Sequence, residues 1–523
     1  MLQIYDKIGV IEDNLFNKGA FQVNKHDKRN QRKIKRNLRK RLKHRPCKRD
    51  IPMLTADTIH YEISGRTQGI HCGGIGSVHM MAKKIGLVKG IDRDLQLLKQ
   101  HQPYHESDHI LNMVYNILAG GSSIEDIEVR REDPGYMKAL GAQRIPDPTT
   151  ARDFLMRFKK RDVKQLMGTI NRIRQRIWRT QSASFRKRAM LNIDSTIAET
   201  TGECKRGMDI AYNGLWGYGP LIVSLANTRE PLYIENRPGN TYSSVNGPAW
   251  TDKAINLVKD IFDEVWIGGD TAFSMTKSLD RWDEEGVNFV LGYTARPSLV
   301  EHAEGLTGWE RLKRPAQYHI RTKPRRHRHN IKERISKRRG YKTEHLAREY
   351  VTEYEHCPKW CKKTYRMIVL KKKIKVTKGQ LELFDQVRYF FYITNNRTVS
   401  ASEAVYISND RCDHENDIEQ LKNGVHALRM PGHDLVSNWA YTVIASLAWT
   451  LKSWMGLLMP HRATGKKIIR MEFKRFLNTF INIPAQIISK AGQVWYRLIG
   501  YMKYAPAFFG FVERCQCLKL PDV

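Results

Sequence analysis

AMLNID, at residues 189–194, and VWIGGD, at residues 265–270, are the two stretches that decide the fold of this chain. Each is a short apolar run typical of a buried strand, and each ends in an aspartate, Asp194 or Asp270. A carboxylate at the carboxyl end of a buried strand lies beside the crevice where α/β folds bind ligands. An aspartate after a strand is also a common turn or capping residue, so either one alone leaves both interpretations open.

Strands and helices alternate around these two stretches. Leu221–Leu225, Leu232–Ile234 and Val287–Leu291 have the apolar pattern of further strands. Pro248–Phe262 and Thr276–Glu285 have the spacing of helices. Three strands, a helix, a strand, a helix and a strand form a mixed α/β order, so we expect an α/β fold.

The segment before this core is helical in pattern. Apolar residues recur at helical spacing through residues 75–160, with a short acidic helix expected at Ser123–Arg130 and another starting at Pro148. Such a bundle could hold a helix-turn-helix that reads DNA, or it could be a packing domain, and the pattern does not choose between them.

Residues 294–400 interrupt the α/β order and predict a strand-rich insertion. Tyr365–Leu370 and Val387–Thr394 read as strands, and Lys323–Lys342 is a dense basic run. The predicted organisation is therefore a basic arm, a helical domain that binds DNA, a core in two segments, the insertion and a C-terminal region. The boundaries are 1–50, 51–180, 181–293 with 401–460, 294–400 and 461–523.

The charge of the chain favours a polyanionic partner. Among 523 residues, 89 are Lys or Arg and 54 are Asp or Glu, which gives a formal net charge of +35. Residues 25–49 alone contain 14 Lys or Arg against one acid, Asp27. This arm is either a solvated, disordered charge run or a helix that binds phosphates, and the net charge favours the second.

Membrane and disulfide classes fit the sequence less well. No signal peptide is visible, and the uncharged run Leu435–Leu451 is short for a membrane span and holds polar residues, so we expect a buried helix. The eight cysteines form no evenly spaced framework, which favours free thiols. Cys357 and Cys361 beside His356, and the pair Cys515 and Cys517, could bind metal, but neither has a second half-site.

A third acidic residue, Glu415, stands on a predicted helix. Arg411, Glu415 and Lys422 lie at offsets −4, 0 and +7, which fall on one helix face together with Ile418. Surface ion pairs would give the same pattern. Phosphodiester cleavage by two divalent cations needs about three carboxylate ligands, with Arg and Lys to hold neighbouring phosphates.

These residues resemble a known family. Asp194, Asp270 and Glu415, in strand, strand and helix order, look like the DDE transposases of bacterial insertion sequences. Arg411-x3-Glu415-x6-Lys422 matches three of the four positions of the Tyr-x2-Arg-x3-Glu-x6-Lys signature in one group of that family. The Tyr position is Ser408 here, so the phosphate contact of that Tyr is in doubt, although Tyr406 lies nearby. The segments at 124–134, 146–150 and 269–273 also resemble the family, and the resemblance covers about residues 75–505.

The resemblance implies a ribonuclease-H-like core and cut-and-paste DNA transposition. It implies that Asp194, Asp270 and Glu415 hold two Mg²⁺ ions, with Mn²⁺ as a substitute, for nicking and for attack of the 3′-hydroxyl on target DNA. It also implies a homodimer on the terminal inverted repeats, in a bacterial, cytoplasmic, nucleoid-associated protein without a membrane anchor. The residues expected to contact DNA are Arg411, Lys422, Lys33, Arg36, Arg39, Lys40, Arg325 and Arg326.

Two other functions remain open. The chain could be a DNA-binding protein with a decayed catalytic core, for which Ser408 is the sequence hint, or a nuclease of the same fold without strand transfer. His414 could shuttle protons, but its direction on the helix differs from that of Glu415 and favours packing. The residues Trp250, Trp282, Trp439, Trp449 and Trp454 could stack on an extruded base, but their apolar stripes favour the core.

Overall fold

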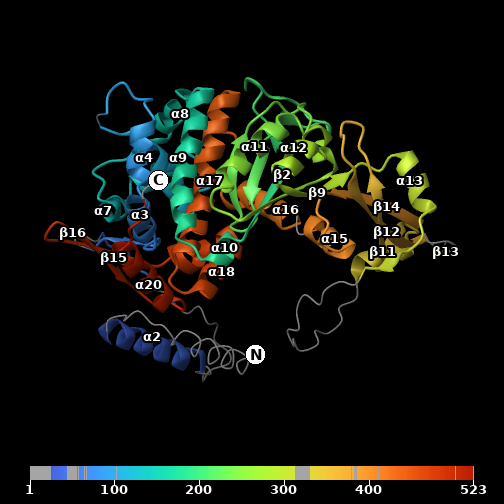
Figure 1. The fold of residues 1–523 in the computed structure, drawn as a ribbon. Coiled ribbons are helices and arrows are strands. Elements are labelled where there is room, and N and C mark those ends of the chain that lie inside the picture. Colours follow the sequence, from blue (N-terminus) through green and yellow to red (C-terminus); the bar gives the residue numbers. More distant parts are fainter. Residues whose placement is uncertain are drawn as a thin grey trace.

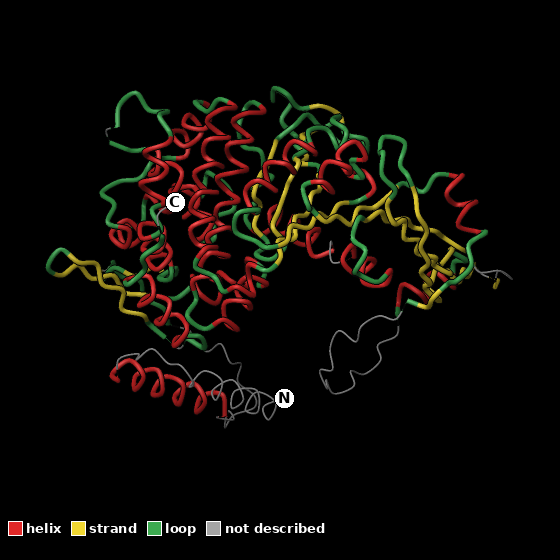
Figure 2. The backbone as a smooth tube through the Cα atoms, viewed as in Figure 1, coloured by secondary structure: helices red, strands yellow, loops and turns green. Residues whose placement is uncertain are grey.

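A helical half and a long mixed sheet lie side by side in the computed structural model of the chain (Figures 1 and 2). The structure describes residues 25–43, 56, 58–63, 65, 67–101, 103–312, 330–378, 380–381, 386–409, 412–500 and 502–521. The mixed α/β class expected from the sequence is confirmed.

The N-terminal half is helical, as predicted. Asp133 and Asp147 cap two of its helices by accepting the backbone N–H groups of Tyr136 and Thr150, which satisfies donors that a helix start leaves unpaired. The short helix expected from Ser123 begins later, because Asp126 accepts the Ser122 and Ser123 N–H groups in a turn. The helices are α2 (Lys25–Lys43), α3 (Ile75–Lys84), α4 (Leu87–Asp94), α5 (Glu106–Leu118), α6 (Ile127–Arg131), α7 (Pro134–Leu140), α8 (Pro148–Met156), α9 (Lys160–Arg179) and α10 (Ala183–Arg186).

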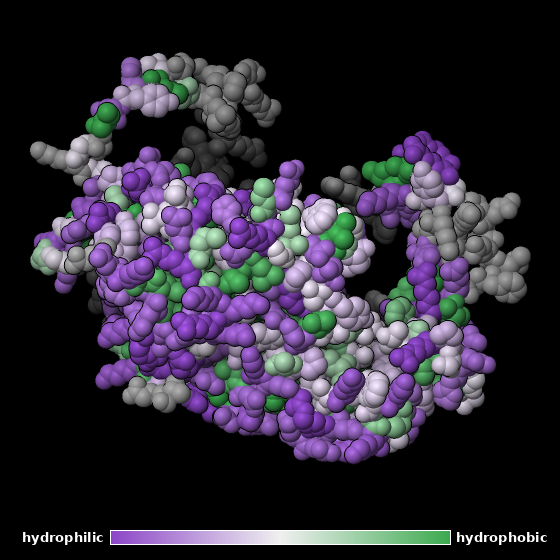
Figure 3. All heavy atoms as spheres, turned by 90° about the horizontal axis from the view of Figure 1, so that it is seen from above, coloured by the Kyte–Doolittle hydropathy of each residue, from purple (hydrophilic) through white to green (hydrophobic). Residues whose placement is uncertain are grey.

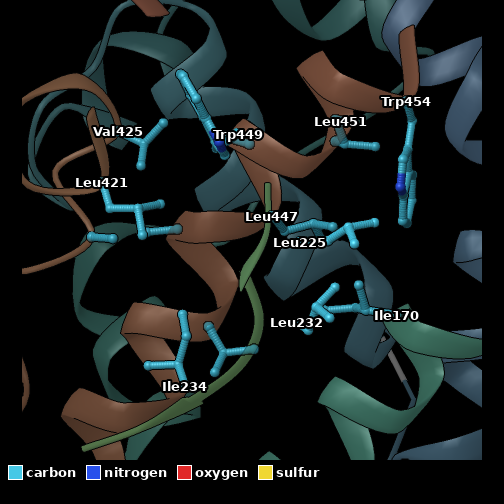
Figure 4. Packing of buried hydrophobic residues seen from close by; sticks show 14 of the residues in the cluster. Ile170, Leu225, Leu232, Ile234, Leu421, Val425, Leu447, Trp449, Leu451 and Trp454 are labelled. Carbon is cyan, nitrogen blue, oxygen red and sulfur yellow. The ribbon is translucent and has the colours of Figure 1, made fainter. Parts of the chain in front are cut away.

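One long helix from the C-terminal part, α17 (Leu435–Leu458), joins this half to the sheet. It contacts α5, α8 and α9 on one side and strand β7 (Glu230–Glu235) on the other. Nearly all of it is buried, which confirms the buried helix predicted from Leu435. Figure 4 shows side chains of α17 meeting apolar residues of α9, of β7 and of the neighbouring segments. Those labelled are Ile170, Leu225, Leu232, Ile234, Leu421, Val425, Leu447, Trp449, Leu451 and Trp454.

The sheet contains the strands predicted around Asp194 and Asp270. Strands β2, β8 and β9 run parallel, and the remaining neighbours along the sheet are antiparallel. The strand order is β10-β11-β12-β14-β9-β8-β2-β6-β7, with β13 paired to β12. The bounds on the core side are β2 (Arg188–Ser195), β6 (Leu221–Leu225), β7 (Glu230–Glu235), β8 (Glu264–Gly269) and β9 (Asn288–Tyr293).

The strands of residues 294–400 continue the same sheet. Strand β14 pairs with β9 of the core, and β12, β11 and β10 follow outward. The two strands predicted there are present and are longer than expected on the β12 side. Their bounds are β10 (Glu310–Arg311), β11 (Lys342–His356), β12 (Tyr365–Lys378), β13 (Gln380–Leu381) and β14 (Gln386–Thr394), with α13 (Pro297–Glu304) and α14 (Ile331–Arg338) between strands.

Helices cover both faces of the core strands. Helix α11 (Gly247–Val258) lies against β2, where a Cβ added to Gly247 would meet Ile193 Cδ1 at 3.5 Å. Helix α15 (Ala401–Asn409) packs on β8 and β9 from the opposite face, and α16 (Cys412–Glu419) follows it (Figure 1). The helix predicted at Thr276–Glu285 is a 3-10 turn, η2 (Thr276–Ser278), followed by α12 (Leu279–Glu284).

Two small sheets were not predicted. Strand β1 (Gly69–Ile70) pairs with β15 (Ala485–Lys490), which pairs with β16 (Gln493–Leu498), so the C-terminal region closes onto the start of the helical half. A second sheet joins β3 (Ala198–Glu199), β5 (Trp216–Tyr218) and β4 (Asp209–Ile210). The remaining elements are η1 (Thr271–Phe273), η3 (Gln420–Gly424), α18 (Arg462–Arg470), α19 (Phe473–Phe476), η4 (Leu477–Ile481) and α20 (Ala505–Gln516).

One face of the described residues is mainly polar. Figure 3 shows one face on which hydrophilic residues predominate and hydrophobic ones form small, separate patches. Within the described ranges, every helix is too short or too polar to cross a membrane.

Candidate active site

The register of the sheet places Asp194 and Asp270 next to each other. Strands β2 and β8 are parallel neighbours, and Ile193 pairs with Gly269. The next residue on each strand is one of the two aspartates, so both stand at the same edge of the sheet. Both side chains are half-buried. The sequence therefore located two carboxylates that the fold brings together.

Each of the two carboxylates accepts a backbone N–H close to it in the chain. Ser195 N donates to Asp194 Oδ1 at 2.7 Å. Ala272 N donates to Asp270 Oδ1 at 2.9 Å, and Asp270 thereby caps η1. Charge-assisted hydrogen bonds of this kind fix the orientation of a carboxylate. Asp270 therefore does have the capping role that the sequence left open. Asp270 also still lies beside Asp194.

Strand alternation assigns the pair to the face covered by α15 and α16. Ile193 points toward α11, so Asn192 and Asp194 point to the other face. Asp270 still has an extended backbone, with φ −79° and ψ −173°, so it continues the alternation of β8. The helix that carries the third predicted acid lies on that same face.

Glu415 is in α16, on the solvent side of that helix. Its neighbours His414 and Asp417 are buried, with exposed fractions of 1% and 4%, whereas Glu415 is exposed. Asp417 faces Arg229 of the β6–β7 turn, with 3.6 Å between Asp417 Oδ1 and the guanidinium. This pair joins α16 to the β6–β7 turn. The burial of His414 agrees with the packing role expected from its direction on the helix.

The three predicted acids do not form a compact metal cluster. Among the residues that the structure describes, no three His, Cys, Asp or Glu side chains are grouped so that they could hold a metal ion. The donor set that the fold brings together is the pair Asp194 and Asp270, whose hard oxygens suit Mg²⁺. The assignment of Glu415 as the third ligand stays a prediction.

The residues predicted to contact DNA are found in different places. Arg411, Arg325 and Arg326 lie outside the described residues. Lys422 is exposed in η3, directly after α16. Lys33, Arg36, Arg39 and Lys40 are exposed along helix α2, so the basic arm is helical over 25–43. Ser408, at the Tyr position of the signature, is buried in α15 with 9% exposure.

The cysteines and tryptophans considered in the sequence analysis are accounted for by packing and local hydrogen bonds. The cysteines named as possible metal ligands are free thiols, and Cys361 Sγ donates to the Thr276 carbonyl. Burial raises the pKa of the Cys361 thiol to about 12. The tryptophans considered for base stacking are buried in the core, as expected; they are Trp250, Trp282, Trp439, Trp449 and Trp454.

Sequence reasoning missed a cleft next to α16. It has a volume of about 1030 Å³ and lies between the start of β2, the β6–β7 turn, α16 and α18. In the described part of the chain, six basic side chains and one acid line it. The basic residues are Lys187, Arg188, Arg229, Arg462, Lys466 and Arg470, and the acid is Asp417. The only sign of this cleft in the sequence is the four-residue spacing of Arg462, Lys466 and Arg470 in α18.

The family of the chain follows from its match to a family model. The model described as transposase DDE domain group 1 matches residues 55–520, which is most of the chain. The chain belongs to this family of DDE transposases. The transposase assignment expected from the sequence is therefore confirmed, and it implies an enzyme of DNA transposition with nuclease chemistry. Members of the family generally use divalent metal ions.

Other comparisons add little to the family assignment. The transposase is similar to a solved structure titled as a piggyBac transposase synaptic complex with hairpin DNA. The identity is 11%, the TM-score is 0.34, and the match covers 78% of this chain and 84% of that chain. No curated protein matches. The family model therefore carries the assignment.

Proposed function

We propose that this transposase cleaves DNA at the ends of an insertion sequence and joins the freed 3′-hydroxyl to target DNA. The observation that carries the proposal is the pairing of Ile193 with Gly269, which sets Asp194 beside Asp270 in a chain of the DDE family. The core order β7-β6-β2-β8-β9, with β6 antiparallel to β2, supports a ribonuclease-H-like arrangement.

Asp194 and Asp270 would hold the divalent ions, with Glu415 as the third ligand. Bound Mg²⁺ or Mn²⁺, as a pair of ions, would supply an activated nucleophile and stabilise the charge on the attacking and leaving oxygens. The protein supplies the fixed orientation of the two aspartates through their backbone N–H donors. Arg411 and Lys422 would contact neighbouring phosphates, Arg through its planar fork and Lys as a point charge.

DNA is the proposed partner because the chain is strongly basic. A net charge of +35 favours a polyanion, and phosphate contacts supply most of the affinity for DNA. The exposed cations of α2, namely Lys33, Arg36, Arg39 and Lys40, would add nonspecific contacts. We propose that a homodimer holds the two terminal inverted repeats together, as the family resemblance implies.

A catalytically inactive DNA-binding protein is the second candidate. Two observations favour it: Ser408 occupies the Tyr position of the signature, and Glu415 is exposed on α16 without forming a described metal cluster. Such a protein would bind DNA with the same charge but would show no cleavage with Mg²⁺ or Mn²⁺.

Cleavage and joining can be tested in one assay. The protein is incubated with labelled duplexes taken from the flanks of its gene, a supercoiled target plasmid and Mg²⁺ or Mn²⁺. The proposed function gives nicks at a fixed position and labelled ends joined to the plasmid. Nicks without joining identify a nuclease, and binding without nicks identifies the inactive protein.

A further inference from the structure

We propose that the cleft between β2, α16 and α18 is a DNA-backbone site that extends from the carboxylates toward the start of β2. The cationic stripe on its rim consists of Arg462, Lys466 and Arg470 on α18, with Lys187 opposite at the start of β2. The inference rests on the proposed function, because that function supplies DNA as the polyanion.

The described residues offer the four cations of the rim no internal counter-charge. The four are exposed, and none forms an ion pair with another residue in the described ranges. The acid of the cleft, Asp417, faces Arg229. Arg188 is paired with Glu264, which lies 2.9 Å away and outside the lining. Like charges gathered in a cleft repel each other, and a bound polyanion would relieve that repulsion.

The stripe is mounted on a rigid support. Helix α18 packs closely on α17, because a Cβ at Gly465 would lie 2.3 Å from the Gly456 carbonyl oxygen. At its other end, buried Lys452 of α17 donates to the carbonyls of Ile469 and Met471, at 2.9 and 2.6 Å. Burial lowers the pKa of Lys452 well below its usual range. Both contacts hold α18 against α17, so the basic stripe has a fixed position at the cleft.

The wall of the cleft also has a buried acceptor that a bound molecule could use. Asn192 is 3% exposed and lines the cleft, and among the described residues its Oδ1 has no hydrogen-bond partner. Buried amide groups in folded proteins are nearly always bonded, to protein or to water. Gly268 on the neighbouring strand leaves room for this amide, because a Cβ there would lie 2.8 Å from Asn192 Oδ1.

The dimensions of the cleft fit a DNA strand better than a single phosphate. Arg462 and Arg470 are eight residue steps apart on the helix, which is about 12 Å. One strand of a duplex passes three to four phosphates over roughly that axial length. Arg188 at the start of β2 lies about 20 Å along the strand from Asp194, whereas Asn192 of the cleft wall is two residues from it. The cleft therefore runs from beside the proposed chemistry to the start of β2, over a length of about six base pairs.

A charge-neutral variant tests this site against a matched control. The test variant combines Arg462→Gln, Lys466→Gln and Arg470→Gln. The control combines Arg157→Gln, Lys160→Gln and Lys164→Gln, three exposed cations at the end of α8 and the start of α9. Both variants remove three positive charges, so a difference in DNA binding between them depends on where the charges lie. Binding of a labelled 30-base-pair duplex is measured from about 50 to 300 mM salt without divalent metal.

The expected result is a change in the salt dependence of binding. The slope of log affinity against log salt should fall by about 2 to 3 for the test variant and by less than about 1 for the control. A slope change equal to that of the control would overturn the site while leaving the proposed function intact. Wild-type protein that fails to bind duplex DNA would overturn both.

A charge reversal provides a second measurement. Lys466→Glu should weaken duplex binding at least about tenfold at 100 mM salt, and Lys164→Glu should change it less than about threefold. Equal effects of the two reversals would contradict the cleft, because net charge alone would then explain the loss. Thermal unfolding of each variant should match the wild type, since both lysines are exposed.

Discussion

Acidic side chains on the same sheet differ in burial and in their partners. Glu230 on β7 is fully buried, pairs with Arg174 at 2.8 Å and accepts the Trp454 indole N–H at 2.7 Å. Asp194 and Asp270 stand half-exposed at strand ends and accept backbone N–H groups close to them in the chain. The first arrangement ties helices α9 and α17 to the sheet. The second leaves carboxylates at an edge that a ligand can reach.

The largest expected effect is on cleavage, at the strand ends. Asp194→Asn or Asp270→Asn should reduce nicking of end-containing DNA by about a thousandfold or more, because each removes a proposed metal ligand. Binding of the same DNA with Ca²⁺ should stay within about twofold. Asp260→Asn, at an exposed position before β8, is the matched control and should cleave normally. Normal cleavage by either variant would show that the aspartate at that strand end is not a metal ligand.

Glu415 gives a separate test of the third ligand. Glu415→Gln should lower nicking by about a hundredfold or more if it joins the two aspartates on the metal. Glu419→Gln, one turn along α16 and also exposed, should leave the rate unchanged. The two rates are compared in the same nicking assay. Equal rates for both variants would assign the third ligand elsewhere.

The buried pair should respond in stability and not in chemistry. Glu230→Ala leaves Arg174 buried without its carboxylate, and breaking such a pair costs about 3–5 kcal/mol. Glu264→Ala breaks a partly exposed pair with Arg188 and a hydrogen bond from the Trp266 indole N–H, and should cost only about 1–2 kcal/mol. Urea unfolding followed by circular dichroism measures both. Similar losses for the two variants would show that burial does not distinguish these acids.

A buried base in the helical half extends the comparison to pH. His109 stacks on Phe154 with ring centroids 4.3 Å apart, and burial lowers its pKa to about 4 from 6.5. In the unfolded chain His109 binds a proton below about pH 6.5, whereas in the folded chain it binds one only below about pH 4. Stability should therefore fall as pH decreases through this window, by on the order of 3 kcal/mol. His109→Phe should remove that part of the slope in urea unfolding, and an unchanged slope would contradict it.

Local patterns predicted most of the elements and the two aspartates at strand ends. Apolar runs such as AMLNID and VWIGGD fixed β2 and β8, because buried parallel strands are almost continuously apolar. The uncharged run from Leu435 identified α17 for the same reason. Asp194 and Asp270 follow these strands and are neighbours, since neighbouring parallel strands end at one edge.

Long-range packing explains what the sequence did not reveal. Strand β1 pairs with β15 more than 400 residues later, with Gly69 opposite Gln486, and no local pattern encodes that pairing. The cleft combines the start of β2, the β6–β7 turn, α16 and α18, so its cations become neighbours only after α18 packs on α17. The exposure of Glu415 likewise depends on how α16 rests beside β2.

The pairing of β9 with β14 has a consequence for how the chain tolerates change in length. The chain leaves the core after Tyr293 and returns at Phe391, and these two residues are direct partners across the sheet. The residues between them form an inserted segment, the excursion, whose two ends lie side by side in the sheet. A short hairpin turn joining β9 to β14 could close the gap without moving either core strand. The excursion could therefore grow, shrink or be exchanged as a module while the register that aligns Asp194 with Asp270 stays the same.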